Sequence, residues 1–189
     1  MQFAVKILVK KEVKSFARNP GGAPANVLAM NSKLGGSSAF IGKVGNDAFG
    51  SYLKDTLSNH NIDITGMATD INVPTTLAFV QLDSKGDRSF SFYRNPGADM
   101  MLNADEVKKE LIDECKIFHF GSLSLTDEPC RKATYDAVNY AKKLGKLEKV
   151  YELNNFIDFI IPDENQKVIY GGVFNFGTEV TEIHKYPML

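Results

Sequence analysis

The stretch from Asn19 to Gly50, NPGGAPANVLAMNSKLGGSSAFIGKVGNDAFG, decides the fold of this 189-residue chain. Its first residues contain two prolines and two glycines, which predict a tight loop over residues 19–26. A helix from about Ala23 to Leu34 is expected next, because proline is tolerated in a first turn and the glycine pair at 35–36 ends a helix. The quoted stretch therefore predicts a loop that leads directly into a helix N-terminus.

Strands and helices alternate on both sides of this stretch, and one predicted hairpin interrupts the alternation. Asp47 is expected to cap one helix, and Asn103 with Glu106 to cap another. The order predicts an α/β layered fold with a mostly parallel sheet, from which the hairpin projects as a lid or an edge. The predicted strands are 3–9, 39–44 and 116–120, the hairpin pairs 75–82 with 88–93, and further helices begin at 48, span 103–115 and span 129–144.

Composition excludes several classes of protein. The 22 Lys and Arg residues nearly balance 23 Asp and Glu residues, which argues against a general electrostatic grip on nucleic acid or on an anionic membrane. No run of eighteen apolar residues is present, so no membrane-spanning helix is expected. The two cysteines, Cys115 and Cys130, are too few for a disulfide scaffold and predict reduced thiols. We therefore expect a globular cytoplasmic protein with no nucleic-acid partner and no membrane partner.

The chain changes character after Gly145. Residues 147–189 are rich in β-formers and predict short antiparallel strands without a clear helix. We divide the chain into an α/β part, residues 1–146, and a β-rich tail of unrecognised origin, residues 147–189. Residues 163–165 (Asp-Glu-Asn) are interpreted as a polar turn, and no metal ligand is assigned anywhere in the chain.

Gly21, Gly22 and Asn26 are the first candidates for a binding site. The two glycines let a ligand approach the backbone closely, because no Cβ stands in the way. The helix behind them presents free N–H groups, and Asn26 offers both a donor and an acceptor. This arrangement suits a polyhydroxylated ligand. The alternative, a simple loop-to-helix junction in which Asn26 is a local cap, has about equal weight on spacing alone.

Several motifs in order make the chain resemble a known family. GGAPANV, LGG and AFIGKVGNDAFG are followed by VPTTLAFVQLDSKGDRSFSFYRNPGADMML and IFHFGSLSL. Over residues 16–146 the sequence is similar to PfkB-type carbohydrate kinases of the ribokinase superfamily, most of all to bacterial fructokinases. The resemblance implies the N-terminal part of a ribokinase-like three-layer αβα fold, truncated, with a β-hairpin lid.

The resemblance also implies a function. Such enzymes transfer the γ-phosphoryl group of ATP, with magnesium, to a sugar hydroxyl, and fructose is the sugar that the motifs favour most. Ribose, 2-keto-3-deoxygluconate and nucleosides are the alternatives. We also expect a homodimer formed through the lid. The residues that match the family's sugar-contacting positions, or lie where α/β sheets hold ligands, are Gly21, Gly22, Asn26, Phe92, Arg94 and Gly121.

Each of these side chains has a structural alternative. Arg94 could form a surface salt bridge, and Phe92 could pack in the core. Lys43 is expected to face the sugar or the solvent, and His119 is interpreted as a hydrogen-bonded core residue rather than a base. A dinucleotide-binding domain is rejected, because no GxGxxG follows the first predicted strand.

The sequence departs from the family pattern where catalysis would occur. The predicted first strand lacks the sugar-binding aspartate, since the first aspartate of the chain is Asp47. No GAGD-type turn is present to supply a general base and an anion hole, and residues 97–99 match a different motif. We therefore assign no catalytic residue and expect this chain alone neither to bind ATP and magnesium well nor to act as a kinase. The alternative function is a non-catalytic sugar-binding or partner-binding fragment of a truncated or frameshifted kinase gene.

Overall fold

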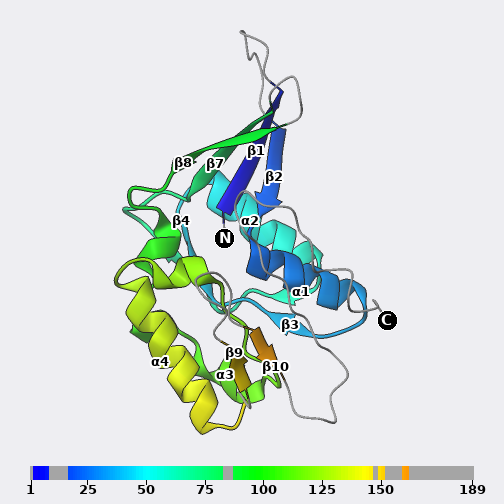
Figure 1. The fold of residues 1–189 in the computed structure, drawn as a ribbon, viewed down its shortest axis with the longest axis vertical. Coiled ribbons are helices and arrows are strands. Elements are labelled where there is room, and N and C mark those ends of the chain that lie inside the picture. The colour runs from blue at the N-terminus through cyan, green and yellow to red at the C-terminus, as the bar shows by residue number, and fades with distance from the viewer. Residues whose placement is uncertain (1, 9–16, 83–86, 147–148, 152–158, 162–189) are drawn as a thin grey trace.

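The computed structural model describes residues 2–8, 17–82, 87–146, 149–151 and 159–161 (Figure 1). Strands and helices alternate only in part along them, because four strands follow α2 in succession and no strand separates α3 from α4. The strands are β1 (Gln2–Leu8), β2 (Ala17–Gly21), β3 (Ser38–Ala39), β4 (Gly42–Gly45), β5 (Ile62–Asp63), β6 (Met67–Asp70), β7 (Leu77–Leu82), β8 (Arg88–Tyr93), β9 (Lys149–Tyr151) and β10 (Phe159–Ile161). The helices are α1 (Ala23–Lys33), α2 (Ala48–Asn59), α3 (Lys109–Glu114) and α4 (Cys130–Lys143), with 3-10 turns η1 (Ala98–Met101), η2 (Ala104–Glu106) and η3 (Ser122–Leu125).

A four-stranded sheet in the order β2-β1-β7-β8 contains the predicted hairpin. Strands β7 and β8 pair antiparallel as expected, and β1 pairs parallel with β7. The loop predicted over residues 19–26 is partly wrong, because residues 19–21 belong to β2 and pair antiparallel with β1. Pro20 is accommodated there because β2 is an edge strand of this sheet, where a missing N–H is tolerated.

Two smaller parallel pairs, β3 with β5 and β4 with β6, lie beside the helices. The single strand predicted over residues 39–44 is therefore divided in two. The division occurs because its ends pair with different partners: Phe40 N donates to Asp63 O at 2.8 Å, whereas Gly42 N donates to Gly66 O at 3.2 Å. Strands β5 and β6 were not expected, since two to four residues carry no periodic pattern.

The helices agree well with the sequence where local signals mark their ends. Helix α1 has Pro24 in its first turn and is followed by Gly35 at φ 87°. The side chain of Asp47 caps α2 by accepting from Phe49 N at 3.0 Å and Gly50 N at 2.7 Å. Helix α4 is followed by Gly145 at φ 69°. None of the described helices is both long and apolar enough to cross a membrane.

Two predicted elements differ from the structure. The helix expected over 103–115 is interrupted: the capping box of Asn103 and Glu106 is present, but η2 ends at residue 106 and α3 begins at Lys109. Residues 116–120 were expected to form a strand, yet they have no strand partner among the described residues. Phe118 and Phe120 pack on α4 instead, as part of an apolar cluster.

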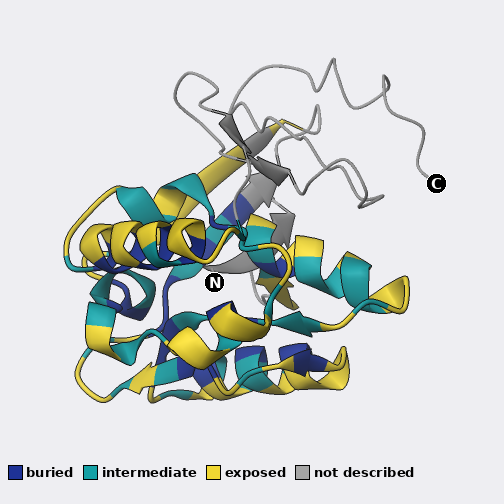
Figure 2. Ribbon diagram, turned by 90° about the horizontal axis from the view of Figure 1, so that it is seen from below, coloured by how far each residue is buried: buried dark blue, intermediate teal, exposed yellow. Residues whose placement is uncertain are grey.

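Two principal apolar clusters pack the helices against their neighbours. Buried and exposed residues lie on opposite sides of the helices (Figure 2). The first joins α1 and α2 to β4, β5 and β6 through Leu53 and Leu57, which are almost fully buried. The second joins α3 to α4 around Ile112. Ile41 packs against the second cluster and also against a smaller one around Leu102 and Ala133, so it links α4 to the β3–β4 segment.

Candidate functional site

The N-terminus of α1 begins at a glycine that no other residue could easily replace. Gly22 has φ 117° and ψ 125°, a conformation that L side chains rarely adopt. Its carbonyl accepts from Asn26 N at 3.1 Å and so starts the helix. The side chain of Asn26 is exposed and forms no hydrogen bond with a described residue, so it does not act as the local cap. Its amide is open to a ligand.

Arg94 is held in a partly buried ion pair rather than on the surface. Its Nε and Nη2 both donate to Oδ2 of Asp99 at 2.8 Å, and Nη2 also donates to Leu123 O at 3.3 Å. Both side chains of the pair are 14% exposed. The hydroxyl of Thr76 donates to the second oxygen of Asp99. The guanidinium is therefore fixed by side-chain and backbone acceptors from two segments of the chain.

Gly121 brings the residues after 120 against the start of α1. A Cβ on this glycine would lie 3.0 Å from Cγ of Pro24, which is tighter than an ordinary contact. Two residues later, the carbonyl of Leu123 on η3 accepts from Arg94. Gly121 and η3 thus connect the α1 N-terminus to Arg94. Four predicted residues, Gly21, Gly22, Gly121 and Arg94, belong to this connected set.

Phe92 lies on β8, the edge strand of the four-stranded sheet. It is 49% exposed and stacks on Phe90 with ring centroids 5.9 Å apart and 9° between the planes. Core packing, the alternative for Phe92, is therefore wrong. Phe92 has no described contact with the α1 N-terminus. Its only link to the candidate site among the described residues is that Arg94 follows it by two residues in the chain.

Asp99 and Thr76, which hold Arg94, were not among the predicted site residues. Asp99 follows Arg94 by five residues, in the NPGAD segment, and an acidic residue so close to a candidate arginine was the available signal. Thr76 is 1% exposed, and threonine at the start of a strand gives no indication of a partner 23 residues away.

Lys43 does not face the solvent, so that expectation for it is wrong, and its ammonium group is bonded to protein groups. It is 7% exposed, with Nζ 3.1 Å from Asp70 and 2.9 Å from Glu106, and it donates to Met101 O at 3.0 Å. Burial alone would lower the pKa of Lys43, but its hydrogen bonds with Glu106 and Asp70 outweigh that effect and raise it. Lys43 is a structural cation that joins β4 to β6 and to η1 and η2.

The surroundings of Asp47 and His119 affect the pKa of each side chain. Besides capping α2, Asp47 accepts from Thr75 N and Thr75 Oγ1, both at 2.8 Å. Burial opposes ionisation of Asp47, yet the bonds from Thr75, Gly50 and Phe49 lower its pKa. Burial lowers the pKa of His119, which favours a neutral imidazole, although the residue is only half-buried and lies outside the apolar clusters.

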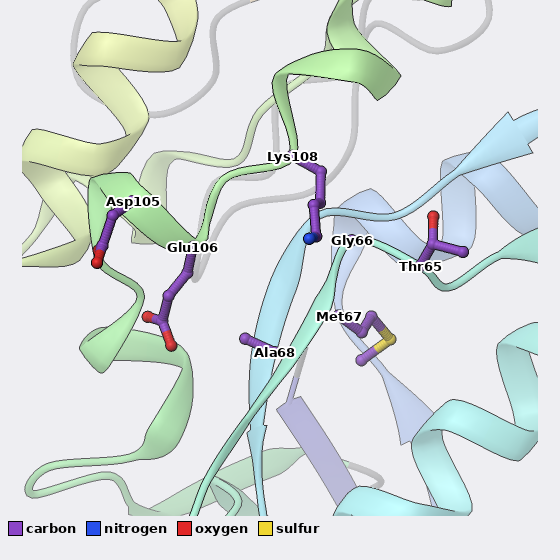
Figure 3. A pocket seen from close by; sticks show the side chains of 7 residues that line it. All are labelled: Thr65, Gly66, Met67, Ala68, Asp105, Glu106 and Lys108. Atoms are coloured by element: carbon purple, nitrogen blue, oxygen red, sulfur yellow. The ribbon is translucent and has the colours of Figure 1, made fainter.

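A separate hollow of about 250 Å³ lies between η2 and the start of β6 (Figure 3). Figure 3 shows Asp105 and Glu106 on one wall and residues 65–68 on the other. None of the six predicted site residues lines it, and the carboxylate of Glu106 is already bonded to Lys43 and Asn103. The carboxylate of Glu106 is therefore not free to bind a ligand in this hollow.

The described residues do not assemble the ligands of a magnesium ion. No group of three or more histidine, cysteine, aspartate or glutamate side chains within the described ranges could hold a metal ion. Asp70 and Glu106 are close together, but both are paired with Lys43. No catalytic step is therefore derived through ATP or magnesium on these residues.

Comparison with known proteins identifies the family and the fold. Residues 4–167 match the family described as "pfkB family carbohydrate kinase". Probable fructokinase-7 of Arabidopsis thaliana is 53% identical over 136 residues, which are 72% of this chain and 40% of that protein. The crystal structure of fructokinase from Xylella fastidiosa superposes with a TM-score of 0.68 at 35% identity, covering 76% of this chain and 46% of that one.

A fructokinase from Vibrio cholerae O395, solved with fructose, ADP and calcium ion, has a TM-score of 0.61 at 32% identity, covering 76% of this chain and 46% of that one. The fold is that of a ribokinase-like α/β protein. The chain belongs to the pfkB family of carbohydrate kinases. It spans about two fifths of the length of the curated relatives that it matches.

Proposed function

We propose that this chain forms the sugar-binding part of a fructokinase-type carbohydrate kinase and that its ligand is fructose. One observation carries the proposal: Arg94 and Gly121, far apart in sequence from the α1 N-terminus, are connected to it through Leu123 and Pro24. The relatives named as fructokinases support the choice of sugar.

The residues offer complementary chemistry for a neutral polyol. The free N–H groups at the start of α1 are donors for sugar oxygens, and Gly21 and Gly22 let the sugar approach them. Asn26 supplies an amide with both donor and acceptor character. Arg94 supplies a fixed guanidinium, and Phe92 is proposed to present an apolar ring face to the sugar.

Calorimetric titration of the 189-residue chain with fructose tests this proposal. We expect saturable binding, and we expect R94Q to weaken it at least tenfold. The matched control is R131Q, because Arg131 also donates from Nε to a carboxylate at 2.8 Å but lies exposed on α4. Equal affinities of the wild type and R94Q would contradict the proposal, as would no binding at all. Ribose, 2-keto-3-deoxygluconate and a nucleoside serve as competing ligands.

The reaction of the family is transfer of a phosphoryl group from ATP to the sugar, for which bound magnesium neutralises charge. We propose that the residues present here bind and orient the sugar only. No aspartate among them is assigned as the general base, and the described acidic groups do not form a metal site. Fructose-dependent ADP formation by the purified chain would overturn this restriction. Fructose binding without ADP formation fits this restriction and also the alternative function of a non-catalytic sugar-binding fragment, whereas no fructose binding would leave only its partner-binding form.

We further propose that two copies associate through the hairpin of β7 and β8. Strand β8 is at the edge of its sheet among the described strands, and Phe90, Phe92 and Tyr93 on it are 43%, 49% and 65% exposed. An edge strand with exposed aromatic residues favours pairing with another chain. Light scattering after gel filtration should give twice the mass of the chain, and F90E should give the single mass.

The cytoplasm is the proposed compartment. Cys115 and Cys130 are both free thiols, and burial raises the pKa of each, which disfavours the reactive thiolate. Such thiols are compatible with a reducing environment. Detection of the chain by cell fractionation in an oxidising compartment or in a plastid would contradict this placement.

A further inference from the structure

Asp99 binds Arg94 with a geometry stricter than that of a surface ion pair. Nε and Nη2 of Arg94 converge on the single oxygen Oδ2, each at 2.8 Å. Both side chains are 14% exposed, whereas the pair of Lys132 and Asp136 on α4 is 68% and 50% exposed. Water screens the Arg94 pair less, so the carboxylate cancels more of the charge of the guanidinium.

The other oxygen of Asp99 is fixed from the opposite side. The hydroxyl of Thr76, itself 1% exposed, donates to Oδ1. Gly97 makes this approach possible, because a Cβ at that position would overlap Thr76 Oγ1. Asp99 therefore cannot rotate away from Arg94 without losing a buried hydrogen bond.

One nitrogen of Arg94 remains available. No described residue accepts a hydrogen bond from Nη1. No buried side-chain nitrogen or oxygen of the described residues lacks a partner, so Nη1 reaches solvent. Arg94 thus offers one oriented donor while its positive charge is compensated.

We propose that Asp99 is a positioning and specificity-determining residue, which aims the free nitrogen of Arg94 and makes the site favour neutral sugars over sugar acids. This inference rests on the proposed sugar site. An unpaired arginine would attract a carboxylate as a bidentate partner. In this site a sugar acid would meet Asp99 as well as Arg94, and the repulsion from Asp99 would offset the attraction.

The test compares fructose, a neutral sugar, with gluconate, a sugar acid, in calorimetric titrations of the whole chain. The wild type should bind fructose with higher affinity than gluconate. The nearly isosteric variant D99N removes the compensating charge, so the ratio of gluconate affinity to fructose affinity should rise about fivefold to tenfold. T76V removes one hydrogen bond to Asp99 but keeps the charge of Asp99. It should therefore weaken fructose binding without raising the ratio of gluconate affinity to fructose affinity. D136N is the control for removal of a paired aspartate elsewhere.

The outcomes separate this inference from the proposed function. Fructose binding with an unchanged ratio in D99N overturns the specificity role and leaves the sugar site intact. No fructose binding by the wild type contradicts the proposed function and removes the basis of the specificity role as well. If D99N does not fold, the rate at which the Arg94 Nε proton exchanges with solvent, measured by NMR in the wild type and in T76V, tests the positioning role. A wild-type proton that exchanges as fast as that of Arg131 would overturn the positioning role.

Discussion

Lys43 and Asp70 form a nearly buried ion pair between strands β4 and β6, with 3.1 Å between Nζ and Oδ2. Glu106 lies 2.9 Å from the same nitrogen and closes a three-membered cluster. The cluster connects the small β4–β6 sheet to the segment before α3. Its position predicts a role in stability rather than in binding.

Replacing Lys43 by methionine should destabilise the chain strongly. K43M leaves Asp70 and Glu106 close together without their cation, and breaking a buried pair in this way costs about 3 kcal/mol. Urea denaturation measures the loss of unfolding free energy. K132M is the matched control, because Lys132 pairs with Asp136 on the exposed face of α4 and its loss should leave the midpoint unchanged. Equal midpoints for K43M and K132M would contradict the assignment.

Stability should fall in acid because several carboxylates have lowered pKa values. The backbone bond from Asn72 and the bond from Lys43 lower the pKa of Asp70. Burial opposes the ionisation of Glu106, but bonds from Asn103 and Lys43 lower its pKa. A carboxylate whose pKa is lowered on folding stabilises the fold above its unfolded pKa, about 4.

That contribution is lost as the pH falls through the folded-state pKa. Urea denaturation between pH 7 and pH 3 should therefore show a decreasing unfolding free energy below about pH 4.5, with a shallower decrease in E106Q. A free energy that stays constant or rises toward pH 3 would be inconsistent with these bonds.

Gly97 should not tolerate a methyl group. The Cβ of G97A would overlap the hydroxyl of Thr76, so we expect a loss of about 1–3 kcal/mol in unfolding free energy. The double variant T76A/G97A removes the overlapping atom and should recover part of that loss. A double-mutant cycle by denaturation measures the coupling between the two residues. Strict additivity would show that Thr76 does not occupy this space.

Gly22 should affect both stability and binding, whereas Gly35 should affect stability alone. Both have positive φ, 117° and 87°, at opposite ends of α1. An L residue at either place is strained by on the order of 1 kcal/mol. G22A also moves the N–H groups proposed to contact the sugar, so it should weaken fructose binding at least tenfold, while G35A leaves the affinity unchanged. Similar fructose affinities for G22A and G35A would contradict a sugar site at the α1 N-terminus.

Local signals in the sequence predicted the elements whose ends carry them. Helix α1 follows from Pro24 at its start and Gly35 after its end, and α2 follows from its cap, Asp47. The hairpin follows from alternating residues on β7 and β8. In each case the determining residues are adjacent in the chain, so no tertiary information was needed.

Features that depend on partners far away in the chain were predicted wrongly or not at all. The strand expected over residues 116–120 has no partner among the described strands, and its aromatic residues serve the α4 interface instead. Lys43 has acceptors 27 and 63 residues away, which no local pattern reveals. The glycines and Arg94 of the candidate site were predicted, but Asp99 and Thr76 were not, because their contact joins the residue before β7 to the segment after β8.

Hydrogen–deuterium exchange of the whole chain, with and without fructose, tests most directly whether the assembled segments form one sugar site. Fructose should protect three segments together, residues 19–26, 92–99 and 119–125, because Arg94, Gly121 and the α1 N-terminus are connected. The hollow formed by residues 65–68, 105, 106 and 108 should show no change in exchange. Protection confined to that hollow, or no protection anywhere, would contradict a sugar site at the N-terminus of α1.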